Sequence, residues 1–516
     1  MDASARYSYD PVLRWNPEVA SYFSHAYGAD HFSRISNALT TPSRYSCIRV
    51  NTLLTSVDEV IEKLRRILNE TGFPGASFSK CDIPGLEYVI FVNGEGPNDI
   101  NYNPSNESCL KEVIVSRKCA EAVLRGAQVF VPGVMACSAH VETGDEVAVS
   151  VAIEKQNSAG EWNISMTRGT VLYGSNNDPY HHERSGLYIG KGTITMSRSG
   201  VFKAAEGVAV DMQSRVFTLP SLHDVMKGEI FLQNLPSIIA AHALDPKCGE
   251  TILDMCAAPG GKTTAIALLM KDQGRIVALD RSHNKVLHIQ KLASEMGLTS
   301  IKPYKMDALR SVKAFPEVVS DVKLPSHPLN EPNPSPHLYA SRASQRKELR
   351  KMKNGPGRNQ CLGERVEPAE RFDEDGFDRV LLDAPCSALG LRPRLFVEEE
   401  TVDSLRRHAV YQRRMFDQAV KLVRSGGVIV YSTCTINPGE NEALVRYALD
   451  NYKYLTLAPP RPKVGGPGLI GRYEAPDGYA EEWLRAGEEH LVQRFDPSSP
   501  LESIGFFIAK FNVGAK

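Results

Sequence analysis

The fold of this chain is decided by the stretch TILDMCAAPGGKT, residues 251–263. Residues 251–254 are typical of a short buried strand, and a helix is expected from Lys262 to Met270. Between them, small residues and glycines would let a ligand approach the backbone closely. The turn follows the carboxyl end of a strand, where open α/β sheets bind ligands. The stretch therefore predicts a ligand site, with an ordinary tight turn as the alternative.

The alternation of strand and helix continues along the chain from this stretch. Strand patterns occur at 275–280, 377–383 and 427–432. Such alternation is typical of a parallel sheet that is covered by helices on both faces. The fold class predicted for this part of the chain is therefore α/β.

A phosphate-binding loop is the rival interpretation of Gly261, Lys262 and Thr263. That motif needs a glycine five residues before Gly261, and Cys256 stands there instead. Asp254 would in addition repel a triphosphate. The sequence therefore argues against a nucleoside triphosphatase.

Acidic residues follow the predicted strands. Asp280 ends the second strand and could accept hydrogen bonds from both hydroxyls of a ribose, as in dinucleotide-binding folds. Capping of the turn at 281–283 is its alternative role. Asp307 follows a third candidate strand and could accept a hydrogen bond from an adenine amino group. Together with Asp254, these carboxylates suit a cationic sulfonium nucleoside better than a phosphate.

Two cysteines occupy corresponding places after later strands. Cys386 lies in the run DAPCS, residues 383–387, and Cys434 lies in the run STCTINP, residues 432–438. Each is expected just past the carboxyl end of a strand, on the same edge as the ligand site. A lone cysteine there is more often a small buried apolar side chain. Two of them, both in loops that carry chemistry, favour a catalytic role.

A thiolate at this edge would suit methylation of carbon 5 of cytosine. That carbon is a poor nucleophile until a thiolate adds to C6 and turns the ring into an enamine. A free thiol has a pKa of about 8.5, so positive charge from Lys262 or from a sulfonium would raise the thiolate fraction. Charge also develops at N3 on addition. Asp383, three residues before Cys386, is the candidate carboxylic partner for that atom.

These motifs resemble the RsmB/Nop/Sun (NSUN) family of RNA cytosine-5 methyltransferases. The matching stretches are 254–263, 277–280, 383–387 and 431–434, and the likeness spans most of 236–450. The resemblance implies a Rossmann-like class I methyltransferase domain that binds S-adenosyl-L-methionine. It also implies that Cys434 is the nucleophile and that Cys386 assists product release.

The expected site residues fall into two groups. The catalytic group comprises Cys434, Cys386, Asp383 and Lys262. The expected cofactor contacts are Cys256, Ala257, Ala258, Pro259, Gly260, Gly261, Lys262, Asp280, Lys285, Asp307 and Asp383. No metal ion is expected.

Residues 111–204 have a different pattern, with short apolar runs between turn signals. Val147, Val149 and Val151 alternate as one face of a strand. This pattern predicts a small β-barrel and resembles the PUA domain that one member of the family carries. The expected division is an N-terminal α+β segment at 1–110 that packs on the catalytic domain, an inserted PUA domain at 111–204, and the methyltransferase domain at 205–516.

Two shorter segments carry expectations of their own. Residues 314–374 combine prolines and a basic run with few large apolar side chains, which predicts a disordered insertion. A basic run is most often a solvated face, with RNA contact or a nuclear signal as the alternatives. Residues 47–51 are similar to the family's N-terminal RNA-contacting segment.

The resemblance implies particular RNA partners. The expected substrate is tRNA, methylated at the cytosine at position seventy-two of the acceptor stem, with the CCA end held by the PUA domain. Some mRNA sites of similar sequence and shape are expected to be methylated as well. The enzyme is expected to act as a monomer.

Composition limits the cellular setting. The 516 residues carry a net charge of −1, so any RNA must be held by local basic patches. The ten cysteines include no C-x-x-C pair, which argues against a zinc ribbon and a disulfide scaffold. Residues 1–4 contain no apolar signal core, and no apolar run reaches the roughly 18 residues of a membrane span. We therefore expect a reduced cytoplasmic location, with a nuclear fraction as an addition, and no membrane partner.

Two other functions compete with the methyltransferase. An RNA-binding scaffold with an inactive methyltransferase fold would be expected to lose Cys434, Asp383 or the turn at 259–261, and all are present. A methyltransferase acting on amino groups resembles a family with an Asn/Asp-Pro-Pro-aromatic motif after the fourth strand. Residues 383–386 lack that aromatic residue.

Overall fold

The computed structural model describes residues 7–71, 73, 76–102, 110–158, 160–172, 186–313 and 370–516. Most of the expected insertion, 314–369, lies outside the described residues. Its last five residues, 370–374, are described. Within them, Phe372 forms a parallel bridge with Val312 and packs edge-on against Phe377. The expectation of disorder is therefore wrong for these five residues, because this aromatic ring anchors them to the sheet that follows.

The C-terminal half of the chain forms the central sheet of the molecule. Its strands, in spatial order, are β16 (Ile301–Lys305), β15 (Arg275–Asp280), β14 (Thr251–Asp254), β17 (Phe377–Asp383), β18 (Val423–Thr433), β23 (Phe506–Val513) and β19 (Leu455–Ala458), with β22 (Val492–Phe495) also paired to β23. The first five strands run parallel, and β23 runs antiparallel to β18. The parallel part is the α/β sheet that the sequence predicted.

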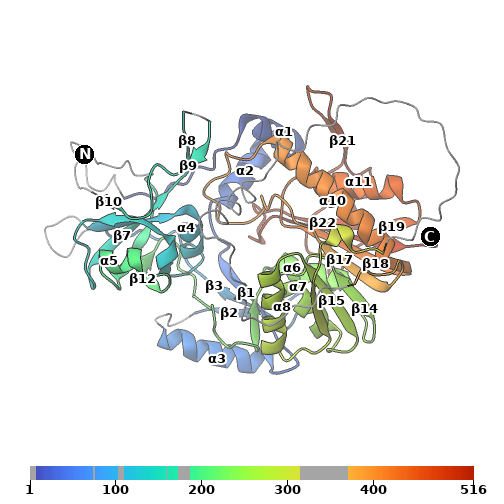
Figure 1. The fold of residues 1–516 in the computed structure, drawn as a ribbon, viewed down its shortest axis with the longest axis horizontal. Helices are drawn as coiled ribbons and strands as arrows, with labels where there is room; N and C mark the ends of the chain where they lie inside the picture. The colour runs from blue at the N-terminus through green and yellow to red at the C-terminus, as the bar shows by residue number, and fades with distance from the viewer. Residues whose placement is uncertain are drawn as a thin grey trace, which may run out of the picture.

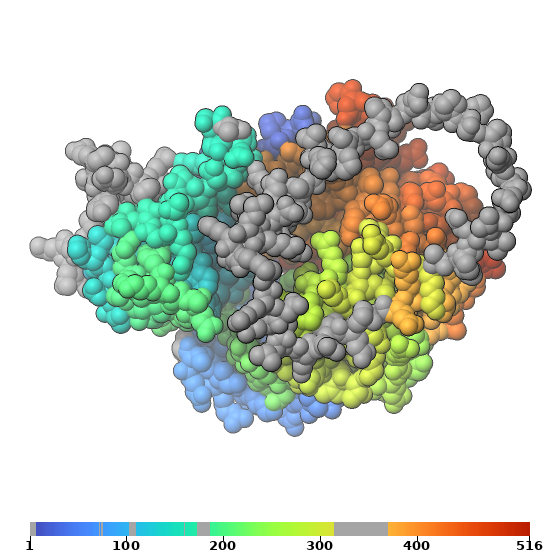
Figure 2. All heavy atoms as spheres, viewed as in Figure 1, coloured from blue at the N-terminus to red at the C-terminus, as the bar shows by residue number. Residues whose placement is uncertain are grey.

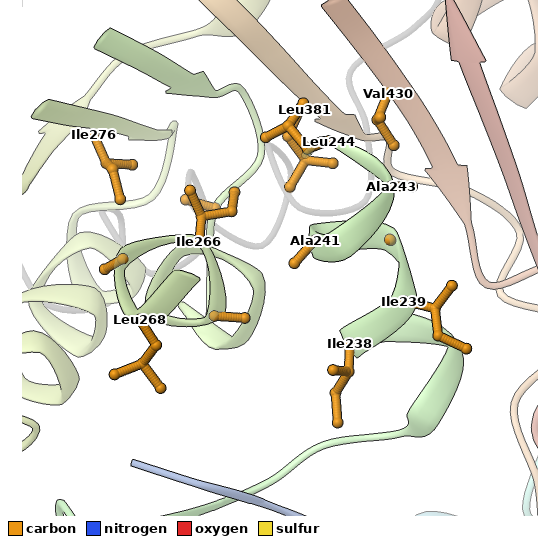
Figure 3. Close-up of a cluster of buried hydrophobic side chains, with 14 of the residues drawn as sticks. Ile238, Ile239, Ala241, Ala243, Leu244, Ile266, Leu268, Ile276, Leu381 and Val430 are labelled. Carbon is orange, nitrogen blue, oxygen red and sulfur yellow. The ribbon is translucent and has the colours of Figure 1, made fainter. Parts of the chain in front are cut away.

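Successive residues of the central strands face two separate cores. Ile252 and Leu381 pack into one core with α6 (Leu235–Ala243), α7 (Gly261–Leu269) and α8 (His283–Glu295). Figure 3 shows side chains of this core from α6 and α7 together with Ile276 of β15, Leu381 of β17 and Val430 of β18. Burial of each large aliphatic side chain contributes about 1.5–3 kcal/mol.

The opposite face of the central sheet carries the second core. Leu253 and Leu382 pack there with α10 (Val402–Leu422) and α11 (Glu442–Asn451). Helices therefore cover both faces of the sheet (Figure 1), and its carboxyl edge is left free for a site.

A second sheet of seven strands lies beside the central domain, at the left of Figures 1 and 2. Its strands, in spatial order, are β10 (Thr170–Leu172), β6 (Val134–Ser138), β4 (Lys111–Ser116), β7 (Glu146–Ala152), β11 (Tyr188–Ile194), β12 (Val208–Arg215) and β5 (Val129–Phe130). Two helices, α4 (Arg117–Val123) and α5 (Arg198–Lys203), belong to the same unit, and a short hairpin of β8 (Lys155–Gln156) and β9 (Trp162–Asn163) projects from it. Because β12 pairs with β11 after the α5 turn, this sheet ends at Arg215 and not at the expected boundary of 204.

The N-terminal segment has a sheet of its own, in the order β13 (Ile230–Leu232), β1 (Tyr45–Val50), β3 (Val89–Asn93) and β2 (Phe78–Lys80). The helix α3 (Val57–Glu70) packs on this sheet through Val60, Leu64 and Leu68. Two further helices, α1 (Pro17–Tyr27) and α2 (Ala29–Leu39), pack on the central domain near α10. Since β13 comes from the chain after the seven-stranded sheet, that sheet is inserted between β3 and β13.

The remaining short elements are the strand pair β20 (Arg472–Glu474) and β21 (Ala480–Glu482) and the 3-10 turns η2 (Val131–Gly133), η3 (Ala308–Arg310) and η4 (Glu489–Leu491). Among the helices of the described residues, none has the length and apolar character that a bilayer crossing requires.

Candidate active site

A cavity of about 570 Å³ lies at the carboxyl edge of the parallel strands. Eight of the sequence-predicted residues line it: Cys256, Ala258, Asp280, Lys285, Asp307, Asp383, Cys386 and Cys434. The outer wall is formed by α10, which contributes Arg407, His408 and Tyr411. Residues up to 178 positions apart in the sequence thus meet at one edge of the sheet.

A smaller pocket of about 190 Å³ shares part of this lining. Ala257, Pro259, Gly261 and Lys262 line it together with residues of the β13 segment. Gly260 lines neither pocket. It precedes α7 with a φ of 108°, in the left-handed region that favours glycine.

The glycine at the start of α7 is required by a close contact. A Cβ atom on Gly261 would lie 2.8 Å from the ring of Phe231. The turn and the β13 segment are therefore in direct contact, and only a residue without a side chain fits between them.

The acidic residues after β15 and β16 are placed beside the cavity. One oxygen of Asp280 accepts a hydrogen bond from the Ser282 amide at 2.9 Å, and the other lies 3.8 Å from the ammonium of Lys285. Asp307 accepts a hydrogen bond from the Leu309 amide at 3.1 Å. Both carboxylates therefore cap local turns, which was the alternative role considered for Asp280, and each still faces the cavity.

Asp254 is fully enclosed at the end of β14. One oxygen accepts a hydrogen bond from the Thr263 hydroxyl at 2.8 Å, and the other has no hydrogen-bond partner among the described residues. Burial raises the pKa of this carboxyl to about 7. Asp254 lines the smaller pocket and not the larger cavity.

The two cysteines lie side by side. Their Sγ atoms are 3.4 Å apart, within hydrogen-bonding distance for sulfur. Donation from the Cys386 thiol lowers the pKa of Cys434, and the same contact raises the pKa of Cys386. Cys434 is therefore the thiol that ionises first, and Cys386 is the one that keeps its proton.

Lys262 and Asp383 form an ion pair next to the cysteines. The Lys262 Nζ atom lies 2.7 Å from one oxygen of Asp383, and the Ser432 hydroxyl donates to the other at 2.7 Å. The positive charge of Lys262 also lowers the pKa of Cys434. The sequence interpretation placed Lys262, Asp383 and Cys434 together, and the structure does the same where the cavity and the smaller pocket share Asp383.

Comparison with known proteins identifies the family. The family described as 16S rRNA methyltransferase RsmB/F matches residues 241–324 and 353–511, and the PUA domain family matches residues 111–154. An Arabidopsis thaliana protein named rRNA (cytosine-C(5))-methyltransferase NOP2C is 59% identical, over 99% of this chain and 93% of its own. Human tRNA (cytosine(72)-C(5))-methyltransferase NSUN6 is 33% identical, over 97% of this chain and 98% of its own.

This chain belongs to the RsmB/F family of RNA cytosine-5 methyltransferases. A solved structure of NSun6 from Pyrococcus horikoshii with SFG, an analogue of S-adenosylmethionine, superposes with a TM-score of 0.67 at 28% identity, covering 97% of this chain and 99% of that one. The predicted Rossmann-like methyltransferase domain with an inserted PUA domain is confirmed, as is the predicted enzyme class.

S-adenosylmethionine is the cofactor of this methyltransferase. The cavity fits it, because its wall combines the carboxylates of Asp280, Asp307 and Asp383 with the apolar side chains of Met306 and Met415. Carboxylates suit the sulfonium charge and the ribose hydroxyls, and the methionines suit the flat adenine ring. Within the described ranges, no group of three or more His, Cys, Asp or Glu side chains could hold a metal ion.

One buried residue that supports the methyltransferase site was missed in the sequence. Arg49, on β1, is fully buried, and its guanidinium donates to Gln233 Oε1 at 2.8 Å and to Thr264 Oγ1 at 2.6 Å. Burial lowers its pKa to about 10. All five residues of 47–51 are buried. They therefore cannot present side chains to RNA, so the expectation drawn from the resemblance is wrong, and Arg49 instead braces the start of α7.

Proposed function

We propose that this enzyme methylates the cytosine at position seventy-two of the tRNA acceptor stem, beside the CCA end, through a covalent bond between Cys434 and C6 of the base. Relatives named for that tRNA position match almost the whole chain, in human and in P. horikoshii. Both carry the name tRNA (cytosine(72)-C(5))-methyltransferase.

The observation that carries this proposal is the contact between the PUA domain and the loop after Cys386. The Leu395 amide donates to the Glu121 carboxylate of α4 at 3.1 Å, and Leu395 itself packs in the core of the PUA domain. Phe396 lies edge-on to Trp162 of β9 and beneath the guanidinium of Arg117. A single-stranded RNA end held by the PUA domain would therefore be close to the catalytic loop, which suits a target base next to the CCA end.

The proposed chemistry assigns one step to each nearby group. The Cys434 thiolate adds to C6 of cytosine, and the carboxyl group of Asp383, in its protonated form, donates a proton to N3, where negative charge develops. The cofactor supplies the methyl group, whose bond to the sulfonium sulfur breaks as its bond to C5 forms. A base then removes the C5 proton, the C5–C6 double bond re-forms, and the Cys434 thiolate leaves. Cys386, or a group that it positions, serves this last step, because its sulfur lies beside the sulfur that must leave.

Ribosomal RNA is the second candidate substrate, since the 59% identical Arabidopsis relative is named as an rRNA methyltransferase. The deciding experiment is methylation of purified tRNA transcripts with and without the CCA end, alongside rRNA fragments, with bisulfite sequencing of the products. The tRNA proposal expects methylation at position seventy-two that depends on the CCA end. Equal methylation of both tRNA forms, or methylation of rRNA alone, would contradict it. Messenger RNA included in the same assay tests the proposed mRNA sites.

A further inference from the structure

A third residue connects the two cysteine-bearing loops. Glu440 lies six residues after Cys434 and is fully buried. No cationic side chain pairs with it in the part of the chain that the structure describes. A buried carboxylate is costly unless hydrogen bonds compensate it, so the donors around Glu440 explain why it is there.

Four neutral donors satisfy the Glu440 carboxylate, two on each oxygen. Oε2 accepts from the Ser387 amide at 3.0 Å and from Gln412 Nε2 at 2.6 Å. Oε1 accepts from the Ser387 hydroxyl and from Asn437 Nδ2 at 3.0 Å. Ser387 follows Cys386, and Asn437 belongs to the loop of Cys434, so one carboxylate holds both loops.

Further hydrogen bonds fix the orientation of those donors. Gln412 Nε2 also donates to the Pro385 carbonyl at 3.1 Å, and Gln412 Oε1 lies 3.1 Å from the Tyr431 hydroxyl, which donates to the Glu440 backbone carbonyl at 2.7 Å. Asn437 Oδ1 accepts from the Gly439 amide at 3.1 Å and lies 3.1 Å from the Tyr22 hydroxyl of α1, whose proton goes to the Glu481 carboxylate. These contacts therefore restrain the Gln412 and Asn437 amides that donate to Glu440.

We propose that Glu440 is the positioning residue that holds Cys386 beside Cys434 for the release step. The inference rests on the two-cysteine mechanism of the proposed function. Without the carboxylate, the Ser387 amide and hydroxyl lose their shared acceptor, and the Cys386 loop is free to move away from the loop of Cys434. Misplacement of a catalytic group by about 1 Å can cost roughly 100-fold in rate.

An electrostatic role for Glu440 would act in the opposite direction. Its negative charge raises the pKa of both thiols. Replacing it with glutamine should therefore favour the Cys434 thiolate and speed addition. A loss of turnover in Glu440→Gln, without an upward shift of the pH midpoint of adduct formation, would come from lost positioning and not from lost thiolate.

The test compares full-length variants during turnover with labelled substrate RNA, using denaturing gels, cofactor calorimetry and the pH dependence of adduct formation. Glu440→Ala should bind S-adenosylmethionine normally, turn over about 100-fold more slowly, and accumulate covalent RNA as Cys386→Ala does. Glu440→Gln should retain part of the activity. Ser387→Ala, which keeps the amide but removes the hydroxyl, should show a smaller effect in the same direction.

The matched control is Glu442→Gln. Glu442 is also fully buried, but it pairs with Arg494 and not with the Cys386 loop. Its variant should lose thermal stability without accumulating covalent RNA.

Three results would overturn the proposal. Cross-linking in Cys386→Ala without cross-linking in Glu440→Ala would refute the role of Glu440 and leave the two-cysteine mechanism standing. Absence of cross-linking in Cys386→Ala itself would refute both. If Glu440→Ala fails to bind cofactor, Ser387→Ala decides, and wild-type turnover in that variant would refute the role of Glu440.

Discussion

The sulfur atoms of Cys386 and Cys434 lie 3.4 Å apart, although 48 residues separate them in the sequence. The contact lowers the pKa of Cys434 and raises the pKa of Cys386. The pair is therefore asymmetric before any RNA binds, with one thiol prepared to attack and the other prepared to hold a proton.

The first prediction is that the two cysteines fail differently when replaced. Cys434→Ala should be inactive and form no covalent adduct, because the addition to C6 never occurs. Cys386→Ala should add to cytosine and then stall, which leaves protein bonded to RNA. A denaturing gel with labelled RNA reads this as a slow band. A band from Cys434→Ala alone would reverse the assignments, and full turnover in both variants would exclude the thiolate mechanism.

The second prediction concerns pH. A hydrogen bond to a thiolate stabilises the charged form, so the Cys386 donor holds the pKa of Cys434 down. Removing this donor in Cys386→Ala should move the pH midpoint of adduct formation to higher pH. Adduct formation should then be fast only above that midpoint. Cys386→Ser keeps a donor and should shift the midpoint less. The measurement is the rate of single-turnover adduct formation between about pH 6 and 10, the range in which thiols titrate. An unchanged or lower midpoint in Cys386→Ala would contradict the assignment.

The third prediction concerns the cofactor. Asp280→Ala should weaken S-adenosylmethionine binding by about 1.5–3 kcal/mol, the worth of a hydrogen bond to a charged group, which is roughly a tenfold or greater rise in Kd. Calorimetry measures the change. Asp272→Ala is the control, because Asp272 caps Thr299 and Ser300 and does not line the cavity. Equal affinities in wild type and a folded Asp280→Ala would remove Asp280 from the cofactor site.

The fourth prediction concerns the buried arginine of β1. Arg49→Met should leave Gln233 Oε1 and Thr264 Oγ1 without the donor that they share. Each unsatisfied buried acceptor costs about 1–3 kcal/mol, so the melting temperature and the cofactor affinity should both fall. Arg66→Met on the exposed face of α3 should change stability by less than about 0.5 kcal/mol. Thermal unfolding with and without cofactor tests the pair, and equal melting temperatures would show that the brace contributes nothing.

The fifth prediction follows from Asp254. Its folded-state pKa of about 7 exceeds the value of about 3.9 expected in the unfolded chain. Between these values the folded state holds a proton that the unfolded state has lost, so this group's contribution to stability falls as pH rises. Asp254→Asn removes that dependence. The melting temperature of the variant minus that of the wild type should therefore be larger at high pH than at low pH across this window, and a constant difference would contradict the raised pKa.

The sequence was sufficient for the strand ends and for the residues that follow them. The predicted strands at 275–280 and 377–383 have the bounds observed for β15 and β17. Since parallel strands share one carboxyl edge, the order of motifs already placed Asp280, Asp383 and Cys434 together. Local patterns of apolar residues and turns are enough for that inference.

Other parts of the site depend on contacts that local patterns do not encode. Arg49 lies in a short strand that resembled an RNA-contacting segment. Only the antiparallel pairing of β13 with β1 shows that Arg49 is buried beneath α7. The run Glu440-Asn441-Glu442 is all polar, and only the structure shows that all three residues are buried. The hydrogen-bond partners of Glu440 come from two loops and from α10, so a local sequence pattern could not predict its role.

The antiparallel pairing of β23 with β18 also sets an order in time. During translation the seven-stranded sheet has all its strands once residue 215 has emerged, whereas β18, which leads to Cys434, gains its second neighbour only when residues 506–513 follow. Until then β18 is an edge strand with an unpaired ladder. Domains fold as units from the N-terminal side during synthesis. The growing protein therefore completes its seven-stranded sheet before the strand that leads to Cys434 is paired on both sides.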